Sequence, residues 1–129
     1  MPAASDIRAL IVDDQQTIRS LVRNGLREIG VQSIEEAVDG EAGLRTLFER
    51  RSNLVISDFN MPKLDGLAFL RAVRATPQLK STAFIMLTGR ADAELLLRAQ
   101  QFGVNNYLVK PFTVQTLRDK IEEVFGTLT

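Results

Sequence analysis

The sequence predicts an α/β fold in which five parallel strands alternate with five helices. Five short apolar runs, near 7–12, 33–37, 54–57, 83–88 and 106–109, alternate with longer segments whose apolar residues recur about every 3.6 positions. This alternation is typical of βα units that build a parallel sheet. The length of 129 residues, with 45% hydrophobic and 25% charged residues, suits one compact domain. We therefore expect a single domain over residues 1–129.

The third and fourth strands are predicted to lie at the centre of the sheet. Leu54–Ile56 and Ala83–Leu87 are continuously apolar, as strands covered on both faces usually are. The flanking strands carry more polar residues.

The helices are predicted from apolar stripes and from residues that begin or end a helix. The stripes are Ile18, Leu21, Val22, Leu26 and Ile29 in the first helix, Leu44, Leu47 and Phe48 in the second, Leu67, Leu70 and Val73 in the third, and Val114, Leu117, Ile121, Val124, Phe125 and Leu128 in the fifth. The first and fifth stripes are wide enough to pack on a sheet. Gly30 is expected to end the first helix, and Asp39 and Asp65 to cap the second and third. A fourth helix is expected over 91–102, with part of its leucine surface exposed.

Composition excludes several classes of function. Sixteen basic and sixteen acidic residues give no net charge, so no overall field attracts nucleic acid or an anionic membrane. The absence of Cys excludes disulfides and thiol nucleophiles, and the absence of His removes the commonest general base. No segment has the roughly 20 apolar residues of a membrane span. We expect a cytoplasmic monomer that binds neither nucleic acid nor membrane.

Polar residues follow four of the predicted strands. Asp13 and Asp14 follow the first, Asp58 the third, Thr88 the fourth and Lys110 the fifth. The carboxyl ends of parallel strands open on one edge of a sheet, where ligands bind, so these residues are predicted to form one site.

The predicted site has the chemistry of phosphoryl transfer to a carboxylate. Three neighbouring carboxylates repel one another and call for a cation, and oxygen ligands suit Mg²⁺. An aspartate can form an acyl phosphate, with lysine, threonine and metal stabilising the transferred group.

Four motifs make the chain similar to the response-regulator receiver family, and in particular to its stand-alone, CheY-like members. They are Leu10-Ile11-Val12-Asp13-Asp14, Ser57-Asp58-Phe59-Asn60-Met61-Pro62-Lys63-Leu64-Asp65-Gly66, Met86-Leu87-Thr88-Gly89 and Tyr107-Leu108-Val109-Lys110-Pro111-Phe112. The resemblance covers essentially the whole chain. It implies a flavodoxin-like, doubly wound sheet in the order 2-1-3-4-5 and a cis bond between Lys110 and Pro111. Gly89 and Phe59 depart from the commonest pattern, where alanine and tryptophan are frequent.

The resemblance also implies a role for each site residue. Asp58 is expected to be phosphorylated by a histidine kinase. Asp14, Asp58 and the backbone carbonyl of Asn60 are expected to bind Mg²⁺ directly, with Asp13 acting through a metal-bound water. Lys110 is expected to pair with the phosphoryl group, and Thr88 and Tyr107 to be the switch residues.

The resemblance further implies a signalling switch that catalyses only its own phosphorylation and dephosphorylation. Its output surface would include Arg90, Leu95, Tyr107 and Lys120 and would bind a downstream protein such as the flagellar motor switch. Asn60 and Arg90 match positions that tune dephosphorylation, which a phosphatase could assist.

Arg19, Arg23 and Arg27 recur every four residues on the first helix. We interpret them first as a solvated face and alternatively as a docking surface for an acidic kinase or phosphatase.

Several alternatives stay open at this point. The chain could serve a phosphorelay, a stress or cell-cycle circuit, or act as a phosphate sink in place of a role in chemotaxis. An aspartate-nucleophile phosphatase is disfavoured because no second acid stands two residues after Asp58 or Asp13. A nucleotide-binding module is disfavoured because neither GxGxxG nor GxxxxGK[ST] is present.

Overall fold

The structure, a computed structural model, describes residues 2–89 and 93–129. Within these residues, five parallel strands form one sheet in the order β2-β1-β3-β4-β5. The strands are β1 (Arg8–Val12), β2 (Ser33–Ala37), β3 (Leu54–Asp58), β4 (Ala83–Thr88) and β5 (Asn106–Val109). The predicted fold class and strand order are therefore confirmed, and the predicted strand bounds differ by no more than one residue at an end.

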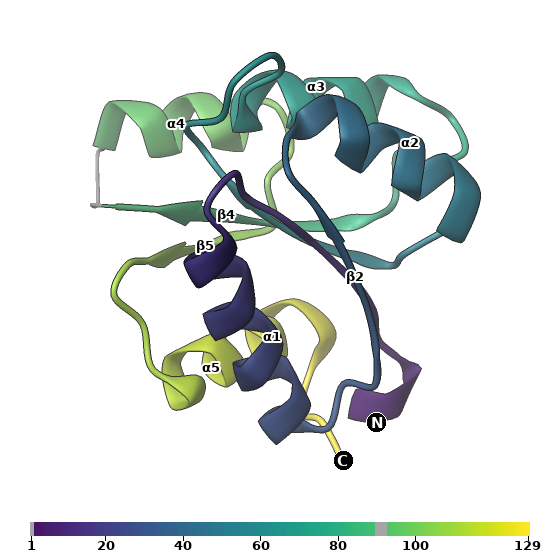
Figure 1. Ribbon diagram of the computed structural model, residues 1–129, viewed down its shortest axis with the longest axis vertical. Coiled ribbons are helices and arrows are strands. Elements are labelled where there is room, and N and C mark those ends of the chain that lie inside the picture. The colour runs from purple at the N-terminus through teal and green to yellow at the C-terminus, as the bar shows by residue number, and fades with distance from the viewer. Residues whose placement is uncertain (1, 90–92) are drawn as a thin grey trace.

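Five α-helices cover the two faces of the sheet (Figure 1). They are α1 (Gln16–Ile29), α2 (Gly40–Arg50), α3 (Gly66–Ala75), α4 (Ala93–Gln101) and α5 (Val114–Phe125), and a short 3-10 helix over Ala4–Asp6 precedes β1. Helices α1 and α5 lie on one face, and α2, α3 and α4 lie on the other. Each face has its own hydrophobic core, because alternate side chains of a strand point to opposite faces. Strands β3 and β4 are buried along their whole length, as their apolar sequences predict.

The predicted helix caps at Gly30, Asp39 and Asp65 agree with the structure, whereas the predicted start of the fourth helix at 91 lies outside the described residues. Asp39 and Asp65 cap α2 and α3, accepting hydrogen bonds from the amides of Ala42 and Ala68 at 2.8 and 2.9 Å. Gly30 ends α1 in the left-handed region at φ 112°. These capping bonds fix where α2 and α3 begin, and therefore where the loops that precede them end.

Four details of the helix stripes need correction. Phe48, in the predicted stripe of α2, is 49% exposed. Leu21 is 53% exposed, because it lies about 100° around α1 from Val22 and faces away from the sheet. Val114, in the first turn of α5, is 36% exposed, and the buried Leu128 lies beyond the end of that helix. The expected exposure on α4 is confirmed at Leu97, which is 60% exposed.

The bond between Lys110 and Pro111 is cis, as expected from the motif. Among the described residues, no helix has the length and apolar character required to cross a membrane.

Candidate functional site

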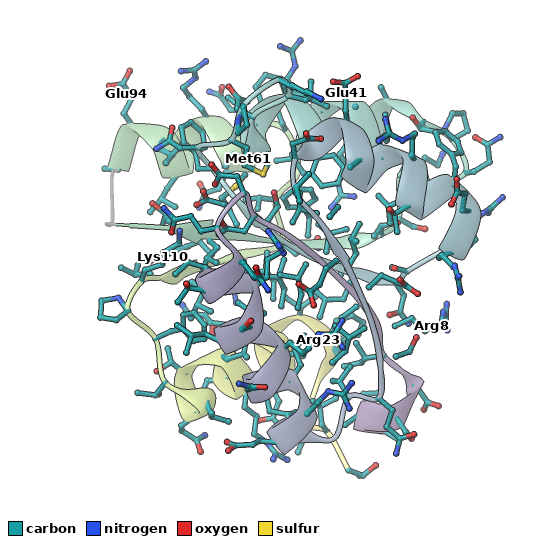
Figure 2. All side chains as sticks on the ribbon, viewed as in Figure 1. Arg8, Arg23, Glu41, Met61, Glu94 and Lys110 are labelled. Carbon is teal, nitrogen blue, oxygen red and sulfur yellow. The ribbon has the colours of Figure 1, made fainter. Side chains whose placement is uncertain are left out.

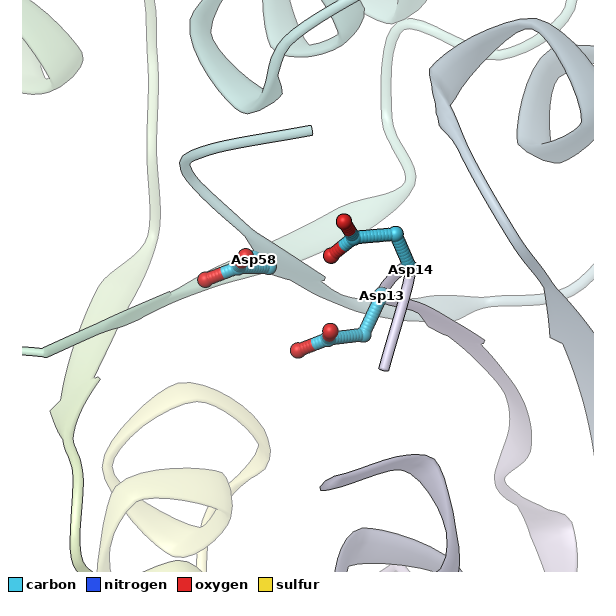
Figure 3. Close-up of side chains that lie close together, drawn as sticks. All are labelled: Asp13, Asp14 and Asp58. Carbon is cyan, nitrogen blue, oxygen red and sulfur yellow. The ribbon is translucent and has the colours of Figure 1, made fainter. Parts of the chain in front are cut away.

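Three carboxylates meet where β1 and β3 end. Asp13 and Asp14 directly follow β1, and Asp58 is the last residue of the neighbouring β3. One oxygen from each carboxylate lies within 4.8 Å of the other two (Figure 3). The predicted convergence of these residues at one sheet edge is therefore present in the structure.

Lys110 brings a positive charge to the cluster from the end of β5. Its Nζ lies 3.0 Å from Asp58 Oδ1 and 3.5 Å from Asp13 Oδ2, and the side chain is 21% exposed (Figure 2). The Lys110 amide donates to the carbonyl oxygen of Thr88 at 2.7 Å, which holds this residue beside the end of β4. One lysine against three carboxylates leaves the cluster with a formal charge of −2 when all four groups are ionised.

Asp13 is the most constrained member of the cluster. Its side chain is fully buried, and Oδ1 accepts a hydrogen bond from the Gln15 amide at 2.8 Å. Burial is the main cause that raises the pKa of Asp13, and the charges of Asp58 and Asp14 also raise it, whereas the Gln15 amide and Lys110 oppose them. Oδ2 is buried and has no hydrogen-bond donor among the described residues. A buried carboxylate oxygen without a donor, next to two further carboxylates, fits a divalent cation that prefers oxygen ligands.

The loop after β3 is held in place at Gly66. The Gly66 amide donates to the carbonyl oxygen of Phe59 at 2.8 Å. A Cβ atom at residue 66 would lie 2.3 Å from the carbonyl oxygen of Asp58, so no larger residue fits without moving the backbone of the acidic site. Asn60 lies exposed in this loop, two residues after Asp58.

Thr88 is the last residue of β4 and is 4% exposed. Strand β4 pairs with β3 so that Leu87 is opposite Asp58, which places Thr88 beside the acidic cluster. The five residues predicted at the strand ends therefore occupy neighbouring strands at one edge of the sheet.

The comparisons with known proteins agree with this geometry. Residues 9–122 match the response regulator receiver domain family. The chain belongs to this family. It is 50% identical over 128 residues to the probable chemotaxis protein CheY of Rhizobium etli, covering 99% of each chain. It is 42% identical to the chemotaxis protein CheY of Pseudomonas aeruginosa, covering 92% of this chain and 96% of that one.

A solved structure shows the same fold. The receiver superposes on the Vibrio cholerae chemotaxis protein CheY4 with a TM-score of 0.86 and 35% identity, over 96% of this chain and 99% of that one. Receiver domains bind Mg²⁺ through an acidic pocket, and here Asp13, Asp14 and Asp58 form an acidic group.

The structure describes three of the four residues predicted for the receiver's output surface. Tyr107, on β5, is half-buried, and the ammonium of Lys120 lies 4.6 Å from the centre of its ring. Leu95 is half-buried on α4. Arg90 lies outside the described residues.

Two of the three arginines predicted to form a stripe on α1 are bound within the receiver. Arg19 and Arg23 donate to the two carboxylate oxygens of Glu36 on β2, at 2.9 and 2.6 Å, and Arg23 is seen beside that strand in Figure 2. Arg19 also donates to the Asp13 carbonyl oxygen at 2.7 Å. The interpretation of these two residues as a solvated face is wrong, because they fasten α1 to β2. Docking of a kinase on this helix stays a prediction.

Sequence reasoning missed three residues that shape the site. Glu36 forms ion pairs with both arginines, Gln15 fixes Asp13, and Gly66 leaves room for the backbone of Asp58. The sequence held a signal for Glu36, because the short strand after the basic helix contains two adjacent glutamates. Nothing in the local sequence pointed to Gln15.

Proposed function

We propose that this receiver accepts a phosphoryl group from a histidine kinase on Asp58, in an Mg²⁺-dependent reaction, and thereby changes its binding to a partner protein. The observation that supports this proposal most directly is the convergence of three carboxylates with Lys110 at neighbouring strand ends. The relatives named as chemotaxis proteins favour a role in chemotaxis. For such a role we propose the flagellar motor switch as the partner.

The metal-binding residues in this proposal are Asp13, Asp14, Asp58 and the backbone carbonyl of Asn60. Asp14 and Asp58 with the carbonyl would be direct ligands, and Asp13 would act through a bound water. When bound, Mg²⁺ supplies positive charge to the acidic pocket and to the oxygens of the phosphoryl group.

The transfer step uses the Asp58 carboxylate as nucleophile. A carboxylate oxygen attacks phosphorus, the N–P bond of the donor phosphohistidine breaks, and its electron pair returns to the imidazole, leaving an acyl phosphate on Asp58. Lys110, already 3.0 Å from Asp58 Oδ1, is placed to pair with the phosphoryl oxygens. Hydrolysis by water later restores the carboxylate and releases inorganic phosphate.

The response to phosphorylation is carried by Thr88 and Tyr107. The Thr88 hydroxyl donates to a phosphoryl oxygen and draws the end of β4 inward, and the Tyr107 ring follows. The surface made by α4, β5 and α5, including Arg90, Leu95, Tyr107 and Lys120, then shifts toward its partner-binding state.

A groove beside the acceptor gives the phosphodonor a place to bind. A cavity of about 450 Å³ lies between α1 and the segment 110–114, and its mostly apolar wall includes Leu21, Phe112 and Val114. Lys110 borders both this groove and the acidic pocket. We assign the groove to a helix of the histidine kinase, because a helix seated there lies next to Asp58.

The first experiment tests the acceptor. Purified protein is incubated with Mg²⁺ and acetyl phosphate, and its mass is measured. We expect one added phosphoryl group in the parent and none in Asp58→Asn. Labelling of Asp58→Asn, or no labelling of the parent with either acetyl phosphate or a kinase, would refute the assignment.

Two further experiments test the partners. Leu21→Glu should slow phosphotransfer from a kinase and leave labelling by acetyl phosphate unchanged. If the kinase phosphorylates Leu21→Glu as fast as it phosphorylates the parent, the groove is not the docking site of the kinase. A flagellar motor switch peptide should bind more tightly when beryllofluoride and Mg²⁺ are present. Unchanged binding would exclude the motor assignment and direct attention to a phosphorelay, another circuit or a phosphate sink.

A further inference from the structure

Lys120 connects α5 to the ring of Tyr107 around the edge of the sheet. Strand β5 is an edge strand, paired only with β4 among the described strands. Helix α5 packs its Leu117 and Ile121 into the core on one face, whereas Tyr107 packs against the core on the other face. The Lys120 ammonium nevertheless lies 4.6 Å from the ring centre, within the range of a cation–π contact.

Asn106 fixes the two residues relative to each other. Its Oδ1 accepts a hydrogen bond from the Tyr107 amide at 3.0 Å, and its Nδ2 donates to the Lys120 carbonyl oxygen at 3.1 Å. One side chain therefore binds the backbone of both the aromatic residue and the cation. We call Asn106, Tyr107 and Lys120 the edge clamp.

The ring is a substantial partner for this ammonium. The Lys120 side chain is only 23% exposed, so most of it is packed against its neighbours. Its ion pair with Glu123 has an N–O distance of 4.0 Å, and Glu123 is 56% exposed. An ion pair at that distance on the surface stabilises the ammonium little. The Tyr107 ring, whose centre lies 4.6 Å from Nζ, is therefore the contact to which we attribute the position of the ammonium.

We propose that Lys120 is a positioning residue for the switch tyrosine. The contact stabilises the ring where it lies in this structure and so opposes its movement toward Thr88, which raises the degree of Asp58 modification needed to switch the receiver. This inference rests on the proposed function, because it describes the energetic cost of that same switch.

The chain offers a direct probe of the ring. Tyr107 is the one tyrosine in the sequence and there is no tryptophan, so tyrosine emission reports on this residue alone. Beryllofluoride with Mg²⁺ is titrated into the parent, Lys120→Met, Lys120→Arg and Glu123→Gln. Tyrosine emission follows the ring, and the ¹⁹F resonance of bound beryllofluoride follows the acceptor site independently.

Removal of the charge should make switching easier. A cation–π contact at a partly exposed site corresponds to about a two- to fivefold change in an equilibrium constant. We expect the beryllofluoride concentration at the midpoint of the titration to be about two- to fivefold lower for Lys120→Met than for the parent. The tyrosine emission of Lys120→Met without beryllofluoride should also differ from that of the parent. Lys120→Arg keeps a cation and should behave as the parent does. Glu123→Gln, which removes only the ion pair, is the matched control and should leave the midpoint unchanged.

The results separate this inference from the proposed function. If the ¹⁹F resonance of bound beryllofluoride appears in both proteins and the titration midpoint is the same for the parent and Lys120→Met, the inference is overturned and the proposed function stays intact. An equal shift in Lys120→Arg and Lys120→Met also overturns it, because packing of the lysine would then matter and its charge would not. Absence of a bound ¹⁹F resonance in the parent overturns the proposed function and the inference with it. In that case, ring-current shifts of the Lys120 ε-protons still show whether the edge clamp exists in solution.

Discussion

Replacement of Asp13 by Asn should stabilise the metal-free receiver. Asp13 is fully buried, and its carboxylate lies within 4.8 Å of two others. At an effective dielectric constant of about 20, two unit charges at that distance repel by about 3.5 kcal/mol. The substitution removes two such repulsions and also removes an attraction to Lys110 at 3.5 Å, worth about 5 kcal/mol on the same scale. The balance is a gain of about 2 kcal/mol, and the amide oxygen still accepts from Gln15.

Urea denaturation in EDTA measures this gain as the difference in free energy of unfolding from the parent. Asp119→Asn is the matched control, because it neutralises an exposed carboxylate outside the cluster and should change stability by less than about 0.5 kcal/mol. With Mg²⁺ the order should reverse. A ligand at one hundred times its Kd adds about 2.7 kcal/mol to the parent, which exceeds the advantage of about 2 kcal/mol, and Asp13→Asn should gain much less of this.

The pH dependence gives a second check of the same reasoning. The pKa of Asp13 is raised in the folded receiver, so its ionised form destabilises the fold above that pKa. As the pH falls through the raised pKa, the parent carboxyl takes up a proton and the advantage of Asp13→Asn should shrink. If Asp13→Asn is less stable than the parent in EDTA at neutral pH, charge repulsion does not dominate this site and the estimate is refuted.

Three further substitutions test other parts of the structure. Gly66→Ala should destabilise the receiver by about 1–3 kcal/mol and weaken Mg²⁺ binding, because its Cβ would displace the Asp58 backbone; parental values in denaturation and in Mg²⁺ titration would contradict this. Burial alone would raise the pKa of Glu36, but hydrogen bonds from the two arginines of α1 lower it. The ionised Glu36 therefore stabilises the fold above the ordinary pKa of a glutamate, and this stabilisation is lost as the pH falls through the lowered pKa. Glu36→Gln should therefore cost about 0.5–1 kcal/mol at neutral pH and less in acid, and a cost independent of pH would exclude this cause. Arg74→Ala should cost about 3 kcal/mol, because the Arg74 guanidinium binds three backbone carbonyl oxygens and an asparagine side chain; a change below about 1 kcal/mol in thermal unfolding would show that water replaces it.

Sequence reasoning located the acidic site well because the site depends on topology. Once the alternation of strands and helices is recognised, the parallel arrangement brings Asp13, Asp58 and Lys110 to one edge whatever the side-chain details. The order of the strands followed from the motifs, since periodicity alone does not decide which strands are neighbours.

Contacts between side chains of distant elements could not be predicted in the same way. Arg19 and Arg23 form a basic stripe when α1 is read alone, and only the position of β2 beside β1 shows that both pair with Glu36. Leu21 belongs to the apolar stripe by spacing, yet lies about 100° from Val22 and faces the groove. A 3.6-residue period defines a broad face of a helix, and the margins of that face depend on what packs there.

The cost of the acidic cluster to stability bears on the proposed switch. Asp13 Oδ2 is buried and has no donor among the residues that the structure describes, and Lys110 compensates only part of the charge. The metal-free fold therefore holds unfavourable energy where the proposed metal and phosphoryl group bind. Burial on both faces makes β3 and β4 rigid. When metal and phosphoryl group relieve this energy, we therefore do not expect the strands at the centre of the sheet to move. The edge strand β5, which is only partly buried and pairs with β4 alone among the described strands, is the nearest strand that can move at a lower cost. The edge clamp on Tyr107 would then set how much of the energy stored in the acidic cluster must be released before the output surface changes.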